Sequence, residues 1–326
     1  MAQRNLGPSR TEPVFDRLTI IGAGLIGSSI ARAVRKVGAA KSVVLADASR
    51  EVIERARALN LGDSYFTSAR EAVVGADIVI FCTPVGAIAE VAAEVAPALK
   101  PGAIVSDVGS VKGAVVAAVG PHLPGGVHFV PAHPVAGTEQ SGPEAGFASL
   151  FVNRWCILTP PEGADARATQ RVATLWTAIG ANVEVMTPEH HDLVLAITSH
   201  VPHLIAYNIV GTAADLEAVT RSEVIKFSAG GFRDFTRIAA SDPTMWRDVF
   251  LNNKDAVLEM LGRFNEDLTA LQRMIRRGDG DGLFELFTRT RAIRRGIVEV
   301  GQETNAPDFG RRSAKDAEEG GDTGGR

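Results

Sequence analysis

Apolar and polar positions follow two different patterns along the chain. In the first half, short runs of consecutive apolar residues predict buried strands. They alternate with segments in which apolar residues recur every three to four positions, which predict helices. This alternation is typical of an α/β fold in which helices cover a doubly wound parallel sheet. Strands are expected at 18–21, 43–46, 77–82, 103–106, 127–130, 155–158 and 183–186, and helices at 25–37, 50–59, 88–99 and 166–179.

The pattern changes after residue 187. Thr187 suits the N-cap of a helix, Pro188 its first position, and Glu189 the positive end of the helix dipole. Beyond this point the spacing of apolar residues is helical throughout. We therefore predict an α/β domain over 16–187 and an all-helical domain over 188–304.

Composition and charge exclude several classes of protein. The net charge of −4 provides no basic field for nucleic acid. No apolar run reaches the roughly 18 residues of a membrane span. The two cysteines, Cys82 and Cys156, lie in apolar runs and are expected to be reduced core residues. We expect a cytoplasmic protein that binds neither nucleic acid nor a membrane.

Both ends of the chain differ in character from the two domains. Residues 1–15 lack the apolar segment of a signal peptide. Residues 305–326 are rich in glycine and mixed in charge. Such segments bury too little apolar surface to offset the entropy of ordering, so both tails are expected to be disordered.

The segment "LTIIGAGLIGSSIARAV" contains a glycine motif of the form G-x-G-x-x-G. It follows a predicted strand and opens a predicted helix. Gly22 permits a tight turn, Gly24 lets the backbone approach a pyrophosphate, and Gly27 lets the helix pack on the strand. The backbone N–H groups at the start of the helix, including those of Leu25 and Ile26, supply positive potential for the phosphates. A simple strand-to-helix turn is the alternative interpretation.

Asp47 makes dinucleotide binding the stronger interpretation. It ends the next predicted strand, 20 residues after Gly27. At that place an aspartate accepts hydrogen bonds from both ribose hydroxyls and repels a 2′-phosphate, which favours NAD over NADP. Arg50 lies nearby and can soften this preference. We therefore predict that 16–187 is a Rossmann-type domain with NAD as its cofactor.

Small or polar residues follow several other predicted strands. In an open parallel sheet, ligands bind beyond the carboxyl ends of the strands. Thr83 and Asp107 are accordingly expected to contact the cofactor, although ordinary turn chemistry explains both residues equally well. The residues expected to face one crevice are Thr83, Asp107, Gly109, Ser110 and His133.

His133 is the strongest candidate for acid–base chemistry. It follows a predicted strand, between Pro131 and Pro134, which stiffen the backbone. An imidazole has an unperturbed pKa near 6.5 and is suited to accept a proton at neutral pH. A structural histidine in a turn is the alternative.

Four further motifs resemble the prephenate dehydrogenase family, which includes arogenate and cyclohexadienyl dehydrogenases. They are "DVGSVK", "HPVAGTEQSG", "TSHVPH" and "GGFRDFTRIAASDPTMW", and they follow the glycine motif in the family's order. The resemblance covers about residues 18–303. The chain shows neither an added chorismate mutase helix nor room for an ACT domain, so it resembles the compact, monofunctional form. The resemblance also implies a homodimer formed through the helical domain.

The resemblance implies an NAD-dependent oxidative decarboxylation of prephenate to 4-hydroxyphenylpyruvate, on the route to tyrosine. His133 would accept the proton of the C4 hydroxyl as hydride departs. Ser110 corresponds to the serine that the family places beside this histidine. Ser110 also suits the N-cap of a helix over 111–119, and both roles are compatible.

Prephenate carries two carboxylates, which cations must bind. The resemblance places the carboxylate-binding arginine at Arg237, whose planar fork matches a carboxylate. Arg233 is expected to pair with Asp234 or other neighbours on a solvated face. Gly230 and its neighbour Gly231 would allow close approach of the backbone to the ligand.

Aromatic and imidazole side chains complete the implied substrate site. The resemblance favours His203 as a further carboxylate contact and places Trp246 near the substrate, although a core tryptophan is the ordinary alternative. His200 would support a helix break at Val201-Pro202. His200 and His203 also have a spacing that fits a metal, but no matching carboxylate or cysteine set accompanies them, and we predict no metal.

The loop after His133 is implied to cover the pocket. Thr138 would contact the substrate, and Glu139 would influence access and inhibition by tyrosine. Asp234 is assigned the same gating role. His190 and His191 lie in the first turn of a helix and are predicted to be surface residues.

Two other classes of protein share some of these features. β-Hydroxyacid dehydrogenases also join a glycine-motif domain to a helical domain but typically use a catalytic lysine. Lys226 and Lys254 are the only lysines between residues 188 and 304, and the His133 loop would be unexplained. An NAD-sensing regulatory protein would need neither a proton acceptor nor a carboxylate clamp.

Overall fold

The computed structural model describes residues 12–138, 140–220 and 230–299. Its N-terminal part contains a six-stranded parallel sheet in the order β3-β2-β1-β4-β5-β6, the Rossmann order. The predicted doubly wound sheet is thereby confirmed. One strand, β3, was missed because three half-buried residues carry no readable pattern. The strands are β1 (Phe15–Ile21), β2 (Ala40–Ala46), β3 (Ser64–Phe66), β4 (Ile78–Phe81), β5 (Ile104–Asp107) and β6 (His128–Phe129).

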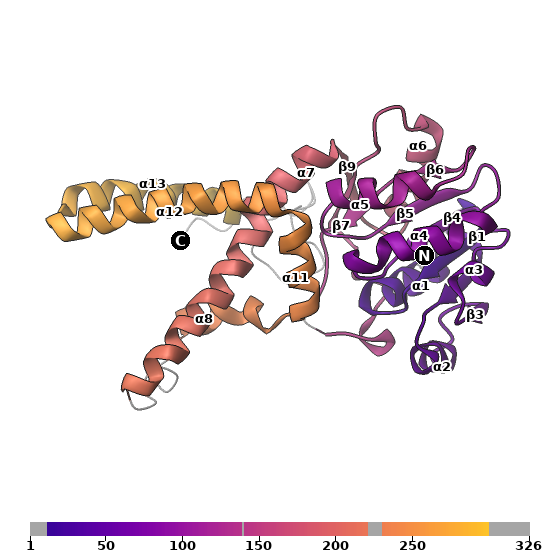
Figure 1. Cartoon of the computed structure of the whole chain (residues 1–326), viewed down its shortest axis with the longest axis horizontal. Helices are drawn as coiled ribbons and strands as arrows, with labels where there is room; N and C mark the ends of the chain where they lie inside the picture. Colours follow the sequence, from indigo (N-terminus) through magenta and orange to yellow (C-terminus); the bar gives the residue numbers. More distant parts are fainter. Residues whose placement is uncertain (1–11, 139, 221–229, 300–326) are drawn as a thin grey trace, which may run out of the picture.

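Helices cover both faces of this sheet (Figure 1). Successive strand residues point to opposite faces, so Leu18 and Ile20 enter one apolar core while Ile21 enters the other. On the first face lie α1 (Leu25–Val37), α2 (Arg50–Ala58) and α6 (Ala166–Ala178); on the second lie α3 (Ala69–Ala72), α4 (Ile88–Val95) and α5 (Gly113–Val119). Short 3₁₀ turns occupy Val85–Ala87, Ala96–Ala98, Gly120–His122 and Pro143–Ala145.

A second sheet of three strands departs from the prediction of a single parallel sheet. Its order is β7-β8-β9, with β7 (Ala132–Pro134) antiparallel to β8 (Trp155–Leu158) and β8 parallel to β9 (Asn182–Val185). The chain leaves the large sheet at Pro131, which has no N–H to continue the ladder. Its carbonyl instead accepts from the N–H of Thr159 at 2.9 Å. His133 therefore lies within a strand, opposite Ile157, rather than in a turn.

Every element assigned after residue 187 in the described chain is helical, as predicted. The Thr187 side chain caps α7 by accepting from the N–H of His190 at 3.2 Å, which confirms the predicted helix start. In Figure 1, α8 and the antiparallel pair α12–α13 extend away from the Rossmann-type domain. The elements are α7 (Pro188–Leu195), a π-helical turn (Ala196–His200), α8 (Val201–Thr220), α10 (Gly230–Thr236), a 3₁₀ turn (Arg237–Ala240), α11 (Pro243–Asn252), α12 (Lys254–Arg277) and α13 (Gly280–Glu299).

The predicted helix break at Val201-Pro202 does not occur. The helix continues from α7 into α8 through the π-helical turn, whose wider hydrogen-bond pattern accommodates a proline that cannot donate. This turn places His200 in a buried position, whereas His203, three residues later, remains half-buried.

Two further expectations change: where the N-terminal tail ends, and whether any helix is long and apolar enough to cross a membrane. Phe15 is buried and begins β1, so the N-terminal tail expected over 1–15 ends before it. Residues 1–11 and 300–326 lie outside the described residues, and their disorder stays a prediction. Within the described chain, the helix Pro188–Asp215 is long and apolar enough to cross a membrane, with a mean hydropathy of 1.5, whereas the sequence pattern indicated no such segment. Its first turns are packed on the Rossmann-type domain, where their side chains contact α5 and β7.

Candidate active site

The glycine motif forms a turn whose three glycines differ in their surroundings. Gly22 has a φ of +100°, and a Cβ there would lie 2.5 Å from the carbonyl oxygen of Cys82. A Cβ on Gly27 would lie 2.0 Å from the carbonyl oxygen of Gly22. Nothing lies within 4 Å of a Cβ built on Gly24. The first and third glycines are therefore required by the protein's own packing. The second leaves open space before the helix N-terminus at Leu25 and Ile26.

Asp47 and Thr83 flank this turn. The carboxylate of Asp47 accepts from the N–H of Ala23 at 3.0 Å and from that of Ser49 at 2.9 Å. An ionised carboxylate offers about four acceptor positions, so ribose hydroxyls can still be bound. The Thr83 hydroxyl is buried and has no hydrogen-bond partner among the described residues. An open glycine turn, an aspartate beside it and an unpaired buried hydroxyl fit a bound dinucleotide.

Asp107 does not face the crevice as the sequence predicted. Its side chain is fully buried and pairs with Lys112, which is equally buried. The same carboxylate accepts from the backbone N–H of Gly109 at 2.7 Å. A buried ammonium needs a counter-charge, and this requirement turns Asp107 inward. Burial lowers the pKa of Lys112, and the charge of Asp107 opposes that shift.

The Asp107–Lys112 pair also holds the backbone beside His133. Asp107 accepts from the N–H of Ala132 at 3.2 Å, and the Nζ of Lys112 donates to the carbonyl of Ala132 at 2.8 Å. The ion pair thereby fixes both peptide groups that flank Ala132, including the one that leads into His133. Lys112 was not recognised as a functional residue, although a lysine inside an apolar segment was the available signal.

His133 contacts a histidine that the sequence analysis assigned to the surface. His133 is 8% exposed, and its Nδ1 lies 2.8 Å from the Nε2 of His191. The Nδ1 of His191 lies 2.8 Å from a carboxylate oxygen of Asp192. The prediction for His191 was wrong: it is buried, because Pro188, His191, Asp192 and Leu195 share one inward helix face. That spacing of three and four residues was a readable signal, whereas His190 is exposed as predicted.

Asp192 links the two domains. Its two carboxylate oxygens accept from the N–H groups of Lys112 and Gly113, each at 2.8 Å. Asp192 therefore satisfies the N-terminus of α5, the role that the sequence analysis offered for Ser110. Burial raises the pKa of Asp192, but the hydrogen bonds from His191, Gly113 and Lys112 outweigh it, and the net shift is downward.

Burial keeps the imidazoles of this site neutral at neutral pH. Burial, with smaller contributions from His191, Lys112 and His200, holds the pKa of His133 well below its usual 6.5. Burial lowers the pKa of His200 to about 4, opposed by Asp192 and by the carbonyl of Ser110. Ser110 thus lies beside His200. A neutral His133 has a lone pair with which to accept a proton.

His203, Trp246 and Arg237 lie together in the helical domain. The His203 ring stacks on the Trp246 indole with 3.6 Å between centroids and 22° between planes. Its Nδ1 donates to the carbonyl of Ser199 at 2.8 Å. Burial lowers the pKa of His203, and the positive charge of Arg237 contributes to the same shift. Trp246 is buried in the apolar core, so it supports the His203 ring.

The candidate residues of the two domains influence one another's pKa values in sequence. His200 acts on the pKa of His133, His203 acts on that of His200, and Arg237 acts on that of His203. We call these four residues the basic row. It extends from the second sheet of the Rossmann-type domain to the 3₁₀ turn after α10. His133 and Arg237, far apart in sequence, are thereby linked through His200 and His203.

Other predicted site residues lie outside this arrangement. Arg233 and Asp234 face each other at 3.8 Å and are 81% and 80% exposed, as expected of a solvated pair. Gly230 is exposed at the start of α10. The exposed Thr138 accepts from the N–H of Gln140 at 3.2 Å. Glu139 lies outside the described residues, so its gating role stays a prediction.

The loop after β7 returns to the start of α1. The N–H of Phe147 donates to the hydroxyl of Ser29 at 3.1 Å. A Cβ on Gly146 would lie 2.1 Å from the hydroxyl of Ser28. The loop therefore packs beside the glycine turn.

In the described part of the chain, no group of three histidine, cysteine or acidic residues could hold a metal.

Two family models match consecutive parts of the chain. The model described as prephenate dehydrogenase, nucleotide-binding domain, matches residues 30–185, and the model described as prephenate dehydrogenase, dimerization domain, matches residues 187–289. The chain belongs to the prephenate dehydrogenase family. Prephenate dehydrogenases are oxidoreductases, and the alternative of a β-hydroxyacid dehydrogenase is thereby excluded. The predicted domain change after residue 187 lies beside the boundary between the two matches.

Similar proteins agree with membership of the prephenate dehydrogenase family. A cyclohexadienyl dehydrogenase of Zymomonas mobilis is 46% identical over 281 residues, which cover 86% of this chain and 96% of the relative. A prephenate dehydrogenase of Bacillus subtilis is 35% identical and covers 86% of this chain and 76% of its own length. The prephenate dehydrogenase of Aquifex aeolicus, solved with hydroxyphenyl propionate and NAD+, has a TM-score of 0.82 at 35% identity, covering 86% of this chain and 98% of its own. The chain therefore has a nucleotide-binding domain for a nicotinamide dinucleotide.

The glycine turn of this chain predicts different outcomes for two alanine substitutions. Gly24→Ala has room for its Cβ and should keep the wild-type melting temperature while weakening dinucleotide binding by about tenfold or more, 1.4 kcal/mol. Gly27→Ala meets the Gly22 carbonyl and should lose about 1–3 kcal/mol of stability. Thermal unfolding and fluorescence titration with NAD measure both effects. Unchanged NAD affinity in Gly24→Ala would contradict the assignment of the open space.

The buried ion pair predicts a partial rescue of stability. Lys112→Met leaves the Asp107 charge buried and should cost about 3–5 kcal/mol of unfolding free energy. The double variant Lys112→Met/Asp107→Leu removes that charge and should regain part of the loss. Its catalytic activity should stay low because the Ala132 backbone loses both contacts. Urea unfolding measures the stabilities, and a Lys112→Met protein as stable as wild type would refute the prediction.

Proposed function

We propose that the chain is an NAD-dependent prephenate dehydrogenase that oxidatively decarboxylates prephenate to 4-hydroxyphenylpyruvate. The observation that supports this best is a buried, neutral His133 at the edge of the sheet that also carries the open glycine turn. The contacts between Ala132 and Asp107, the last residue of β5, place His133 beyond the carboxyl end of the large sheet. This is the edge at which the glycine turn also lies. A cytoplasmic location, and the absence of nucleic-acid and membrane partners, stay predictions.

The proposed chemistry assigns one proton transfer to His133. Its imidazole takes the proton of the C4 hydroxyl while the C4–H bond breaks. A bound nicotinamide supplies the acceptor for the hydride and its electron pair. The bond between C1 and its carboxylate then breaks, CO₂ leaves, and the electron pair completes the aromatic ring. The proton returns from His133 to the C4 oxygen, so the base is regenerated and no net proton is released.

Arg237 and His203 suit the binding of the substrate's carboxylates. Arg237 is exposed at the start of its 3₁₀ turn, and a guanidinium matches a carboxylate with two parallel hydrogen bonds. His203 is held on Trp246 and donates its Nδ1–H to a backbone carbonyl, so its Nε2 donates to a carboxylate only in the protonated form, which the charge of a bound carboxylate favours. Ser110, whose backbone lies beside His200, is assigned the contact with the ring between these ends.

The preference for NAD over NADP rests on Asp47. Its half-buried carboxylate is held beside the glycine turn by Ala23 and Ser49, where it meets a ribose and repels a 2′-phosphate. Arg50, at the start of α2, is the residue that would counter this preference.

Arogenate or dual specificity is the second candidate function. The observation that favours it is the 46% identity to a cyclohexadienyl dehydrogenase. Arogenate differs from prephenate by an amino group in place of the side-chain keto group. The same kinetic assay with arogenate distinguishes the candidates, and a protein that only senses NAD would produce no steady NADH with either substrate.

Steady-state kinetics test the proposed roles. Wild-type protein should form NADH on addition of prephenate. His133→Asn should lower kcat by about 10²–10⁴-fold while keeping its affinity for NAD, because a general base contributes that much. Arg237→Ala should chiefly raise KM for prephenate, since it removes ground-state binding.

Arg233→Ala is the matched control for Arg237→Ala. Arg233 lies one turn earlier, is 81% exposed and pairs only loosely with Asp234 at 3.8 Å. Its removal should leave both kinetic constants near wild type. If the two arginine variants raise KM equally, the assignment of Arg237 is wrong.

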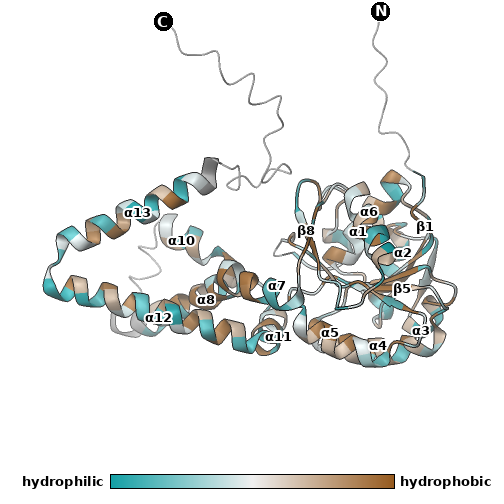
Figure 2. Cartoon of the chain, turned by 90° about the horizontal axis from the view of Figure 1, so that it is seen from above, coloured by the Kyte–Doolittle hydropathy of each residue, from teal (hydrophilic) through white to brown (hydrophobic). Residues whose placement is uncertain are grey.

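We also propose that the helical domain forms a homodimer. Large hydrophobic side chains are exposed on its helices, including Leu251 at 67%, Ile275 at 65% and Phe284 at 72%. Figure 2 shows such hydrophobic residues recurring along α12 and α13. Patches of this kind mark protein interfaces, and the matched family model is described as a dimerization domain.

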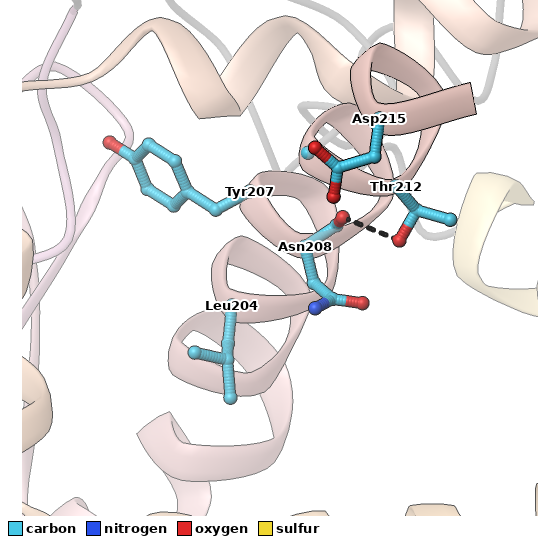
Figure 3. A pocket seen from close by; sticks show the side chains of 6 residues that line it. Leu204, Tyr207, Asn208, Thr212 and Asp215 are labelled. Atoms are coloured by element: carbon cyan, nitrogen blue, oxygen red, sulfur yellow. Dashed lines mark hydrogen bonds between the residues drawn. The ribbon is translucent and has the colours of Figure 1, made fainter. Parts of the chain in front are cut away.

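A shallow pocket lies on the exposed part of α8. All six lining residues come from this one helix, among them Leu204, Tyr207 and Asp215 (Figure 3). A second protein chain can cover such an open concavity, whereas a single helix cannot enclose a small ligand.

Sedimentation at micromolar concentration tests the dimer. The expected species has about twice the 34.4 kDa mass of one chain. Phe284→Glu and Ile275→Glu should shift the equilibrium towards monomer because they place charges in the apolar interface. Val74→Glu is the control, since Val74 is also exposed but lies in the Rossmann-type domain. A wild-type protein that sediments only as a monomer would contradict the proposal.

A further inference from the structure

We propose that Asp192 and His191 set the proton positions on His133, so that the Nε2 lone pair of His133 accepts the hydroxyl proton of the substrate. Both act as positioning residues through His133 and need no contact with the substrate. The proposal deepens the proposed function and rests on it. The arrangement of protons itself follows from the hydrogen bonds and the burial of these residues, without the substrate.

Asp192 determines the tautomer of His191. An ionised carboxylate only accepts hydrogen bonds, and Asp192 already accepts from the backbone N–H groups of Lys112 and Gly113. The Nδ1 of His191, 2.8 Å from the same carboxylate, must therefore carry a proton and donate it. A neutral imidazole has a single N–H, so the Nε2 of His191 bears a lone pair.

His191 in turn determines the tautomer of His133. The Nε2 of His191 lies 2.8 Å from the Nδ1 of His133, a separation that requires one proton between the two nitrogens. Because His191 presents a lone pair, the proton belongs to the Nδ1 of His133. The Nε2 of His133 then carries the lone pair that a general base needs.

The charges around the pair favour this arrangement over its opposite. A protonated His191 would donate from both nitrogens, and His133 would then hold its own proton on Nε2, where it blocks the base. Burial lowers the pKa of His191, and the charge of Lys112 opposes its protonation, although Asp192 favours it. The net shift is downward, so neutral His191 is the form present at neutral pH.

The same contacts stabilise His133 after it has taken the proton. His133 then donates from Nδ1 to His191, whose Nδ1–H points at the negative charge of Asp192. Neither His191 nor Asp192 gains or loses a proton over the cycle, since the proton returns from His133 to the substrate oxygen. Their contribution is orientation and charge, as in other His–carboxylate pairs.

This device assembles only when the two domains are docked. His191 and Asp192 belong to α7, whereas His133, Lys112 and Gly113 belong to the Rossmann-type domain. Asn253, which precedes α12, donates to the Asp192 carbonyl at 2.8 Å and supports the position of α7 from the helical side. The proton arrangement of the base therefore depends on the domain interface.

Nitrogen-15 NMR of histidine-labelled protein tests the arrangement without substrate. In the wild-type protein, His133 should show a protonated Nδ1 and an unprotonated Nε2. Asp192→Ala removes the acceptor for the Nδ1–H of His191, so neither the His191 nor the His133 tautomer should stay fixed. This variant should lower kcat by about 10²–10⁴-fold, the contribution of a general base, while the affinity for NAD stays unchanged.

Substitutions of His191 separate positioning from folding. His191→Gln keeps an acceptor for His133 and should retain the His133 tautomer and part of kcat, whereas His191→Leu should lose both. His190→Gln is the matched control, because His190 is the adjacent, exposed residue. Melting temperatures of all variants identify any loss that comes from unfolding.

The outcomes separate this inference from the proposed function. A wild-type His133 that carries its proton on Nε2, or a His191→Leu protein with wild-type kcat, would overturn the inference. In that case the proposed function stands if NADH still forms. Conversely, the expected tautomer in a protein that oxidises neither prephenate nor arogenate would overturn the proposed function and leave the proton arrangement supported.

Discussion

A fully buried lysine and aspartate pair at the carboxyl end of the central sheet, and the site is built around them. Lys112 cannot be buried without Asp107, and together they hold both peptide groups of Ala132. The next residue, His133, is thereby fixed by backbone contacts rather than by its own side chain. An imidazole positioned in this way keeps its two nitrogens for other partners, one inside the protein and one for a ligand.

Several imidazoles can be buried together because their neutral forms add no charge to the site. Lys112 brings one positive charge, and Asp107 and Asp192 bring two negative charges, each satisfied by backbone N–H groups. His133, His191 and His200 add none in their neutral forms, which burial favours. Further from the sheet, where the site is more exposed, the basic row ends in a permanent positive charge at Arg237. The polarity of the site therefore changes from neutral imidazoles to a cation.

The two domains make different contributions. The Rossmann-type domain has its own apolar cores on both faces of the sheet, whereas the helical domain leaves large apolar side chains exposed. From the helical domain, α7 contributes His191 and the π-helical turn contributes His200 to the surroundings of His133. Docking of the helical domain and organisation of the site are consequently the same event.

The sequence by itself determined what short-range chemistry decides. The glycine turn, the helix start at Thr187, the helical character after it and the family motifs are all local patterns, and each could be interpreted without knowing its partners. The tertiary structure decided which side chains face each other. The large sheet ends before Pro131, so His133 lies in a strand of the small sheet. Asp107 pairs with the buried Lys112, and His191 lies on the inward face of α7, in contact with His133. The partners in these contacts lie up to 80 residues apart in sequence: Asp107 and Lys112 are 5 residues apart, and Lys112 and Asp192 are 80 apart. Only burial in the folded protein shows which of these polar groups must satisfy one another.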